Sequence, residues 1–347
     1  GGWTYMEKGA DLVTILPLTV LNAVSQSFFM GMFFFIGAYF THLSFQKKGL
    51  LKFSRERLIR LGIPLVLTFF FISVLTTYIA LPAKNPRYAN ISFPELWNGG
   101  RAFGFGVMWF VLALCYFTFL YLIAYWLIPA LRKKERKPLP KIKTHYVLIS
   151  SILVGLATFL VRIKYPLFKG NGISWLPFDL GHFPQYIFLF IFGVVAARYN
   201  SDSFVTFKQA KRWACIVAAL TFIVFPFMFF IGKAHINGIQ SFAGRGTWHS
   251  LAYALWEQII GFSIMIALMG ILKAKWNYQS RFAQKLSNSA YGVYALHPPV
   301  LVGISVLFIN WKTILLVKFL VLTPLAVAGS FGIALLVKQM PLLRKIF

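Results

Sequence analysis

The sequence predicts an all-α protein whose helices cross a membrane as a bundle. Of its 347 residues, 59% are hydrophobic and 12% are charged, about half the charged share of an average soluble domain. Nine apolar runs are long enough to cross a hydrocarbon core of roughly 30 Å as helices. A soluble fold of this length could not bury so much apolar surface, so we expect a polytopic membrane protein.

The expected spans follow one another along the chain, with polar connections and no soluble domain between them. In order, they cover residues 24–42, 58–81, 106–130, 145–163, 184–199, 212–232, 250–271, 290–310 and 314–338. We therefore expect one integral-membrane domain over residues 1–347.

The orientation follows from where the basic residues fall. Of the 35 Lys and Arg residues, 24 lie in stretches that share one side if the segment 42–60 is cytoplasmic. Cytoplasmic connections of membrane proteins are enriched in Lys and Arg, so the N-terminus is expected outside and the C-terminus inside.

The net charge of +27 does not indicate a nucleic-acid partner. The charges form short clusters between apolar segments, and no element resembles a groove-reading module. No zinc-like or nucleotide-loop spacing is visible either, so we expect no nucleic acid and no metal.

The start of the chain is unusual for this topology. It begins at Gly1, and the opening "GGWTYMEKGADL" lacks the apolar core of a signal peptide. Nine spans with an external N-terminus would become an ordinary topology with one further helix upstream of Gly1, so we expect an N-terminally truncated domain.

Two arginines mark the cytoplasmic end of the second expected span. Arg57 and Arg60, in "SRERLIRLGIPLV", are three residues apart and share one helix face. They can be anchors that reach lipid phosphates. They can equally be a paired clamp, because planar guanidinium groups bind phosphate oxygens in a bidentate manner.

Glu257 is the one carboxylate well inside an expected span, about 10 Å from its outer end. A charge within hydrocarbon is costly and needs a partner or a wet cavity. An arginine or amide partner, or a cavity that takes a hydroxylated substrate from outside, would each explain it. In the outer loop before the fifth span, Asp179 and His182 can line an outer mouth together with Arg162 and Arg245, or belong to a solvated loop.

The eighth expected span carries "YGVYALHPPV", in which Pro298 and Pro299 remove two amide donors and free the carbonyls of Tyr294 and Ala295. We expect the helix to break near His297, which opens polar groups onto a cavity, although a kink with a hydrogen-bonded histidine is the plainer alternative.

Together these stretches resemble the acyltransferase 3 family of bacterial integral-membrane acyltransferases. The likeness is carried by "GMFFFIGAYF" (31–40), "RERLIRLGIPLV" (55–66), "MWFVLALCYFTFLY" (108–121), "DLGHFPQYIFLFIFGVVAARYN" (179–200) and "SAYGVYALHPPVLV" (289–302). One departure is a Gly37–Ala38 pair where the family usually has Ser-Gly, a change that preserves close helix packing. Another is that the family's first helix, with its arginine and catalytic histidine, would lie before Gly1.

The resemblance implies about ten transmembrane helices in a bacterial plasma (inner) membrane. It also implies transfer of an acyl group, often acetyl, from cytoplasmic acyl-coenzyme A to a hydroxyl of a glycan or lipid-linked sugar. The family's RxxR motif matches Arg57 and Arg60, and its terminal signature matches Tyr294, His297 and Pro298. Of these, Arg57, Arg60, Tyr294 and His297 are the expected coenzyme A residues.

For the acceptor we expect Glu257, Asp179 and His182 to bind a sugar hydroxyl. The catalytic residue stays open: the family histidine is expected upstream, and Glu257 and His297 are the candidates within this chain. Membrane lipids are further expected partners. A transporter or flippase for a polar lipid or glycan is the rival hypothesis, because buried charges and a proline-broken helix also suit a transport pathway.

Overall fold

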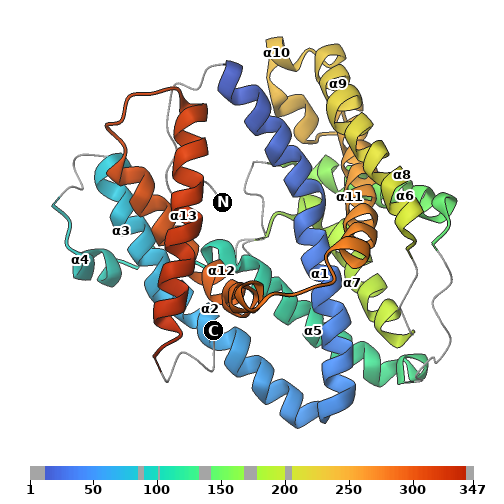
Figure 1. Cartoon of the computed structure of the whole chain (residues 1–347), viewed down its shortest axis with the longest axis horizontal. Helices are drawn as coiled ribbons and strands as arrows, with labels where there is room; N and C mark the ends of the chain where they lie inside the picture. Colours follow the sequence, from blue (N-terminus) through green and yellow to red (C-terminus); the bar gives the residue numbers. More distant parts are fainter. Residues whose placement is uncertain are drawn as a thin grey trace. The chain divides into compact units, whose positions relative to one another are not determined.

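A computed structural model describes residues 12–84, 90–100, 102–132, 142–167, 178–199 and 205–340. Within these ranges the regular structure is entirely helical (Figure 1). The α-helices are α1 (Leu12–Arg57), α2 (Ile63–Leu67), α3 (Ser73–Lys84), α4 (Phe93–Asn98), α5 (Trp109–Leu127), α6 (Thr144–Lys164), α7 (Phe183–Arg198), α8 (Phe207–Ala219), α9 (Phe225–Ile231), α10 (Ala234–Asn237), α11 (Trp248–Lys275), α12 (Arg281–Leu307) and α13 (Leu315–Val337).

Shorter helical turns join several of these helices. The π-helical turns are η1 (Leu58–Gly62), η2 (Thr68–Ile72) and η7 (Leu220–Val224), and the 3₁₀ turns are η4 (Gly106–Met108), η5 (Pro129–Arg132), η6 (Leu180–His182) and η8 (Ile239–Ala243). One of the three π turns, η1, contains Arg60, and η2 follows it after α2, a feature that the apolar pattern of the sequence did not indicate.

Eight helical runs in the described part of the chain are long and apolar enough to cross a membrane. This confirms the all-α polytopic fold, and seven of the runs coincide with one expected span each. The first run, Thr14–Ala83, covers the first two expected spans in 70 residues. The expected loop at 42–60 is instead helical, and its sharp bend is at Gly49, where φ is 71°. Glycine takes this left-handed conformation without a steric penalty, so the helix can turn there without ending.

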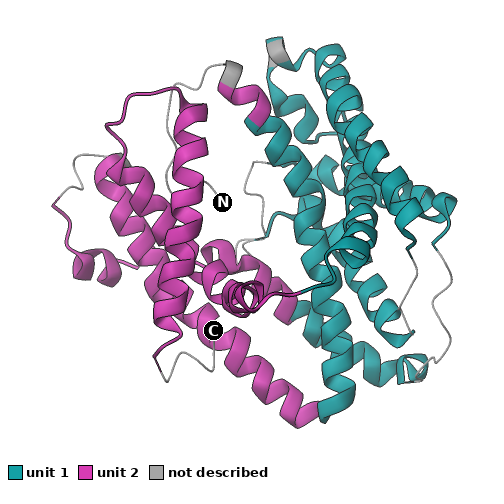
Figure 2. Cartoon of the chain, viewed as in Figure 1, with its two compact units in different colours: residues 1, 18–49, 116–278 teal, residues 2–17, 50–115, 279–347 magenta. Residues whose placement is uncertain are grey.

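The chain forms two compact units (Figure 2). Unit 1 consists of residues 1, 18–49 and 116–278, and unit 2 of residues 2–17, 50–115 and 279–347. One unit boundary falls directly after Gly49, and another lies within α5, after Cys115.

Helix α11 is the central element of unit 1. In its most apolar stretch 67% of the residues are buried, against 17% for the run that contains α8 and α9. It contacts both α6 and α8 (Figure 1). Close approach depends on glycine: a Cβ at Gly261 would lie 2.2 Å from the carbonyl oxygen of Ser27 in α1.

A similar close contact joins α7 to α1 within unit 1. A Cβ at Gly193 would lie 2.3 Å from the Phe35 carbonyl oxygen and 2.9 Å from the Ala38 side chain, and Ala38 is fully buried. Ala38 therefore lies at a tight helix crossing, where a small residue is required.

In unit 2, α12 contacts both α3 and α13. Aromatic side chains fill much of its interior around η2, where Phe69 packs against Phe103 and Phe105. Most large apolar side chains on α13 are exposed, as expected for a surface that faces lipid tails.

Candidate functional site

The structure gathers the predicted site residues into two clusters, one in each unit. In unit 1, Arg162 at the end of α6 donates from Nη2 to Oε2 of Glu257 on α11 at 2.6 Å. The two side chains are 0% and 1% exposed. The arginine that explains this intramembrane carboxylate is thus a neighbour in space and far away in sequence.

His182 completes this cluster from η6, at the start of α7. Its Nδ1 lies 3.2 Å from Glu257 Oε1 and 3.2 Å from Arg162 Nη2. The side chain is 15% exposed, so it is the most accessible member of the three. Prediction from the sequence named both His182 and Glu257 as candidates, and the structure brings them into contact.

Backbone contacts hold the loop that carries His182. Arg162 donates from Nε to the carbonyl oxygen of Gly181 at 3.1 Å, and Asp179 Oδ1 accepts from the Gly181 amide at 3.2 Å. A Cβ at Gly181 would lie 2.8 Å from the Leu167 side chain, so the chain passes closely here. Asp179 therefore caps the η6 turn, while Arg245, the other expected residue of an outer mouth, donates its amide to the Arg162 carbonyl at 3.1 Å.

Several buried polar atoms around this cluster have no hydrogen-bond partner within the described residues. They are Glu257 Oε1, Arg162 Nη1, Thr158 Oγ1, Ser250 Oγ and Gln258 Oε1. A buried polar atom without a partner costs about 1–3 kcal/mol, so native proteins keep few of them. Their concentration beside a charged pair suits a site whose hydrogen bonds are completed by a polar ligand.

The second cluster lies in unit 2, where α1 gives way to the π turn η1. Arg57 is the last residue of α1 and is half-buried, while Arg60 lies inside η1 and is exposed. Turns of π-helix inside longer helices are frequently found at functional sites. The exposed guanidinium of Arg60 is available to an external anion.

A proline explains how α12 contacts this turn. Pro64 has no N–H to donate to the carbonyl four residues earlier, which belongs to Arg60. The hydroxyl of Tyr291 on α12 donates to this carbonyl at 3.0 Å. The interaction fixes the backbone of the arginine pair and leaves the guanidinium of Arg60 unaffected.

The side chain of Arg57 has a more enclosed environment. Its guanidinium carbon lies 5.4 Å from the centre of the Phe53 ring. It is also close enough to the Cys115 thiol and the Tyr291 hydroxyl to interact with them electrostatically. Sequence spacing alone did not identify Tyr291 or Cys115 as neighbours of the arginines.

The expectation of a broken eighth helix is wrong. α12 runs without interruption from Arg281 to Leu307, with both prolines inside it. The physical reason is local: His297 Nδ1 lies 2.9 Å from the Tyr294 carbonyl oxygen, the acceptor that Pro298 leaves without an amide donor. The imidazole replaces the missing backbone donor, so the helix does not need to open.

Tyr294 is held by the neighbouring helix of unit 2. Its hydroxyl donates to the carbonyl oxygen of Val107 in η4, and its ring meets that of Phe110 edge-on. Tyr294 and Tyr291 both pack against a core that includes Leu61 and Leu65. Two of the four expected coenzyme A residues are therefore linked through Tyr291. Tyr291 donates to the backbone carbonyl of Arg60 and packs against the same core as Tyr294.

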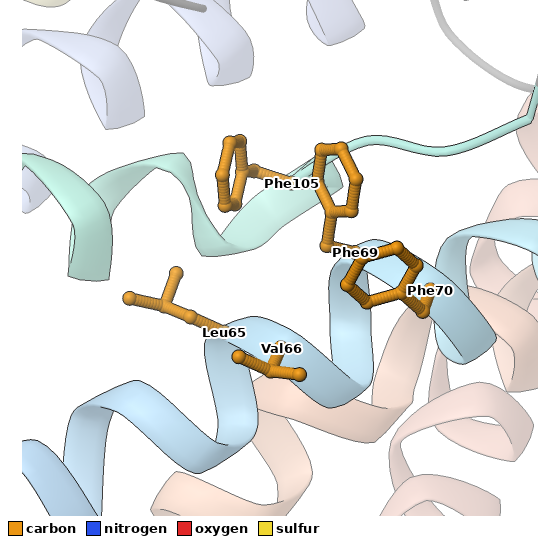
Figure 3. Close-up of a pocket in the computed structure, with 5 residues that line it drawn as sticks. All are labelled: Leu65, Val66, Phe69, Phe70 and Phe105. Carbon is orange, nitrogen blue, oxygen red and sulfur yellow. The ribbon is translucent and has the colours of Figure 1, made fainter.

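An apolar pocket lies further along the same segment of unit 2. Figure 3 shows Leu65 and Val66 from α2, Phe69 and Phe70 from η2, and Phe105 lining it. Only carbon atoms line this pocket, so it suits a hydrocarbon chain. It offers no polar contact to a sugar or to the phosphates of a donor.

The described residues contain no cluster of three or more His, Cys, Asp or Glu side chains arranged to hold a metal ion.

Comparison with known proteins agrees with this membrane architecture. Residues 4–337 match the family model described as an acyltransferase domain, that of the acyltransferase 3 family. Glucans biosynthesis protein C of Escherichia coli O139:H28 is 24% identical over 295 residues, which is 82% of this chain and 72% of that protein. The protein of the same name from Salmonella gallinarum is 24% identical over 291 residues, with the same two coverages.

No solved structure shows significant similarity to this chain. The family match nevertheless extends over nearly all of the described helices, including those that carry both clusters. The chain is therefore a multi-pass membrane acyltransferase that belongs to the acyltransferase 3 family.

Proposed function

We propose that this protein is an O-acyltransferase of the bacterial plasma membrane. It transfers an acetyl group from cytoplasmic acetyl-coenzyme A to a hydroxyl of a cell-surface or periplasmic glycan. Family membership supports acyl transfer, and the named role of the 24% identical relatives in glucan biosynthesis supports a glycan as the acceptor.

The observation that carries the donor assignment is the arginine pair at the π turn. Arg57 is half-buried among Phe53, Cys115 and Tyr291, and Arg60 is exposed on the next turn. An enclosed guanidinium beside an exposed one fits a ligand with several phosphate oxygens, such as coenzyme A. The excess of basic residues predicts that this end of the helix is cytoplasmic, the side where acyl-coenzyme A is found.

The acceptor site in this proposal is the cluster of Glu257 and His182, with Asp179 supporting its loop. The end of α6, the start of α7 and the start of α11 lie on one side of unit 1, because all three contribute to the same contacts. The predicted orientation places this side outside. A carboxylate, an imidazole and nearby unpartnered polar atoms can bind several hydroxyl groups of a sugar.

Binding of acetyl-coenzyme A to the purified chain in detergent tests the donor site. The double variant Arg57→Ala, Arg60→Ala should bind about 10–100-fold more weakly, because each hydrogen bond to a charged group contributes about 1.5–3 kcal/mol. Arg55→Ala is the matched control: it removes the same charge from an exposed position two residues away on α1, and it should bind as the wild type does.

If the double variant and the control bind acetyl-coenzyme A with equal affinity, the assignment of the donor site to these arginines is wrong. Transfer of labelled acetyl to a glucose oligosaccharide by the same preparation tests the acceptor class. A flippase or transporter would instead move its substrate without any dependence on coenzyme A. The dependence of activity on coenzyme A therefore distinguishes the acyltransferase from this rival function.

A further inference from the structure

Three basic side chains lie at the end of unit 1 that carries the candidate acceptor site. Lys164, Lys233 and Arg245 are exposed, and none of them forms an ion pair within the described residues. Basic residues are normally depleted on the outer side of a membrane protein, which is the side that the predicted orientation gives to this end. Their presence here therefore calls for a separate reason.

The carboxylates in the described part of unit 1 do not balance these charges. There are two, Asp179 and Glu257. Asp179 accepts from the Gly181 amide at 3.2 Å, and Glu257 accepts from Arg162 at 2.6 Å. The described side chains thus leave this end with a net positive charge, which attracts anions to the candidate acceptor site.

Two of the three basic residues have a backbone conformation that favours glycine. φ is 65° at Arg245 and 52° at Lys233, and these are the non-glycine residues with positive φ in the described part of the chain. A Cβ is sterically unfavourable in the left-handed region, and residues held there are concentrated at binding sites. Arg245 also lies between Gly244 and Gly246, so a third glycine would relieve the backbone at no steric cost. The guanidinium at this position therefore has a role that glycine could not supply.

The turn that carries Arg245 is fixed to the end of α6, directly beside the buried ion pair. The Arg245 amide donates to the Arg162 carbonyl at 3.1 Å. A Cβ at Gly244 would lie 2.4 Å from the same carbonyl oxygen, so the two backbones are in direct contact. Arg162 therefore contacts Glu257 through its side chain and this turn through its backbone.

The other two basic residues follow segments that contact the same region. Lys164 follows Ile163, whose Cγ1 would lie 3.9 Å from a Cβ at Gly246. The second lysine follows Gly232, where a Cβ would lie 2.4 Å from the ring of Phe242. All three charges thus belong to neighbouring segments at one end of unit 1.

We propose that Arg245, with Lys164 and Lys233, binds an anionic group of the acceptor, so that the acceptor is a glycan bearing phosphate or carboxylate groups. This inference rests on the proposed function and narrows its class of acceptor. Arg245 contacts the anion, because a planar guanidinium binds phosphate or carboxylate oxygens in a bidentate manner. The two lysines add attraction at longer range. Hydroxyl groups of the same glycan reach Glu257 and His182.

A phospholipid headgroup of the outer leaflet offers the same phosphate chemistry. The glycan is favoured because the Arg245 turn is bound to the backbone of Arg162, which is fully buried and belongs to the candidate acceptor site. Basic residues that anchor a protein to lipid are usually long side chains on the outer surface of the spanning helices.

Equilibrium binding to the purified chain in detergent, without a donor, tests this proposal. The probes are a glucose oligosaccharide and the same oligosaccharide with a phosphate on one primary hydroxyl. The wild type should bind the phosphorylated form about 3–10-fold more tightly, as expected for an exposed but bidentate contact. Arg245→Gly should lose most of this preference and keep its affinity for the neutral form. Because glycine relieves the left-handed backbone, the thermal unfolding temperature of this variant should equal or exceed that of the wild type.

Two further variants separate charge from geometry and position. Arg245→Lys keeps the charge without the planar fork and should retain part of the preference. Arg212→Gln removes an exposed arginine from α8, on the predicted cytoplasmic side, and should behave as the wild type does. Equal affinity of the wild type for the two oligosaccharides, or an undiminished preference in Arg245→Gly, would overturn the proposal.

The remaining outcomes identify what is wrong. If the wild type does not distinguish the oligosaccharides but phosphatidylglycerol stabilises it and not Arg245→Gly, the anion is a lipid headgroup and the glycan proposal is wrong. If the wild type prefers the phosphorylated form but transfers acetyl from acetyl-coenzyme A to neither, the proposed function fails while the anion site stands. If it transfers acetyl to both forms and binds them equally, only the anion site is overturned.

Discussion

Each unit contains arginines at its candidate site, but the surroundings of these arginines differ. In unit 1, Arg162 is fully buried and its charge is matched by Glu257, one side chain against another. In unit 2, Arg60 is exposed and the neighbouring Tyr291 binds its backbone carbonyl. The first arrangement holds a site rigid, whereas the second fixes the backbone and leaves a guanidinium available for an anion.

The largest effect that this comparison predicts is on stability: replacing the arginine of unit 1 should destabilise the protein far more than replacing the arginine of unit 2. Arg162→Ala would leave the Glu257 carboxylate buried without its charged partner, and we expect a loss of about 3–5 kcal/mol in the free energy of unfolding. Arg60→Ala should cost about 1 kcal/mol or less, as substitutions at exposed positions usually do. Thermal unfolding of both variants in the same detergent measures the difference.

A double variant sharpens the result for unit 1. Arg162→Met combined with Glu257→Leu removes both charges and should regain much of the stability lost by Arg162→Ala, because apolar side chains of similar volume often replace a buried ion pair at little cost. Equal losses for Arg162→Ala and Arg60→Ala would contradict the contrast between the two units.

The next effect concerns His297, which replaces a missing backbone donor in α12. His297→Ala would leave the Tyr294 carbonyl without a partner, at an expected cost of about 1–3 kcal/mol in unfolding free energy. His297→Asn keeps a donor near the position of Nδ1 and should recover part of the loss. An Ala variant as stable as the wild type would indicate that the interaction with Tyr294 does not support the helix.

A smaller effect is expected where Tyr291 holds the Arg60 carbonyl. Tyr291→Phe removes one hydrogen bond, so we expect a loss of about 1 kcal/mol in unfolding free energy. Because the Arg60 backbone is then less fixed, affinity for acetyl-coenzyme A should also fall about two- to tenfold, the range that about 0.5–1.4 kcal/mol corresponds to. Tyr278→Phe, on a largely exposed tyrosine in unit 1, is the control for loss of a hydroxyl.

The smallest effect is a dependence on salt that the arginine pair of unit 2 should show and the buried ion pair of unit 1 should not. Raising ionic strength from about 0.1 to 1 M shortens the screening length from about 10 to 3 Å, which weakens attraction to exposed charges. The affinity for acetyl-coenzyme A should therefore fall several-fold. The extra stability of the wild type over Arg162→Ala should be unchanged, since solvent ions do not reach a pair that is 0–1% exposed.

The helical spans could be predicted from the sequence because hydropathy is a property of neighbouring residues. The expected run at 145–163 corresponds to α6 at Thr144–Lys164, and 250–271 corresponds to α11 at Trp248–Lys275. The helical bend at 42–60 was missed because basic residues suggest a loop, whereas a single glycine with positive φ is enough to redirect a helix.

The contacts of the site depend on residues far apart in the chain, which no local pattern specifies. Glu257 was recognisable as a charge in need of a partner, but Arg162 lies 95 positions away. The prediction of a broken helix at His297 failed because it gave more weight to the donors that the prolines remove than to the donor that the histidine supplies, although a hydrogen-bonded histidine was the stated alternative. The position of Pro64, four residues after Arg60, was a signal that could have pointed to a side-chain partner for that carbonyl.

The pairing of each proline with a compensating side chain also has a genetic consequence. Replacing Pro64 by alanine would restore an amide donor for the Arg60 carbonyl, so the Tyr291 hydroxyl would become redundant. The same reasoning links Pro298 to His297. In each pair, if the proline is substituted first, the later substitution of its partner should have little effect on stability. In the reverse order, the first substitution produces a destabilised protein.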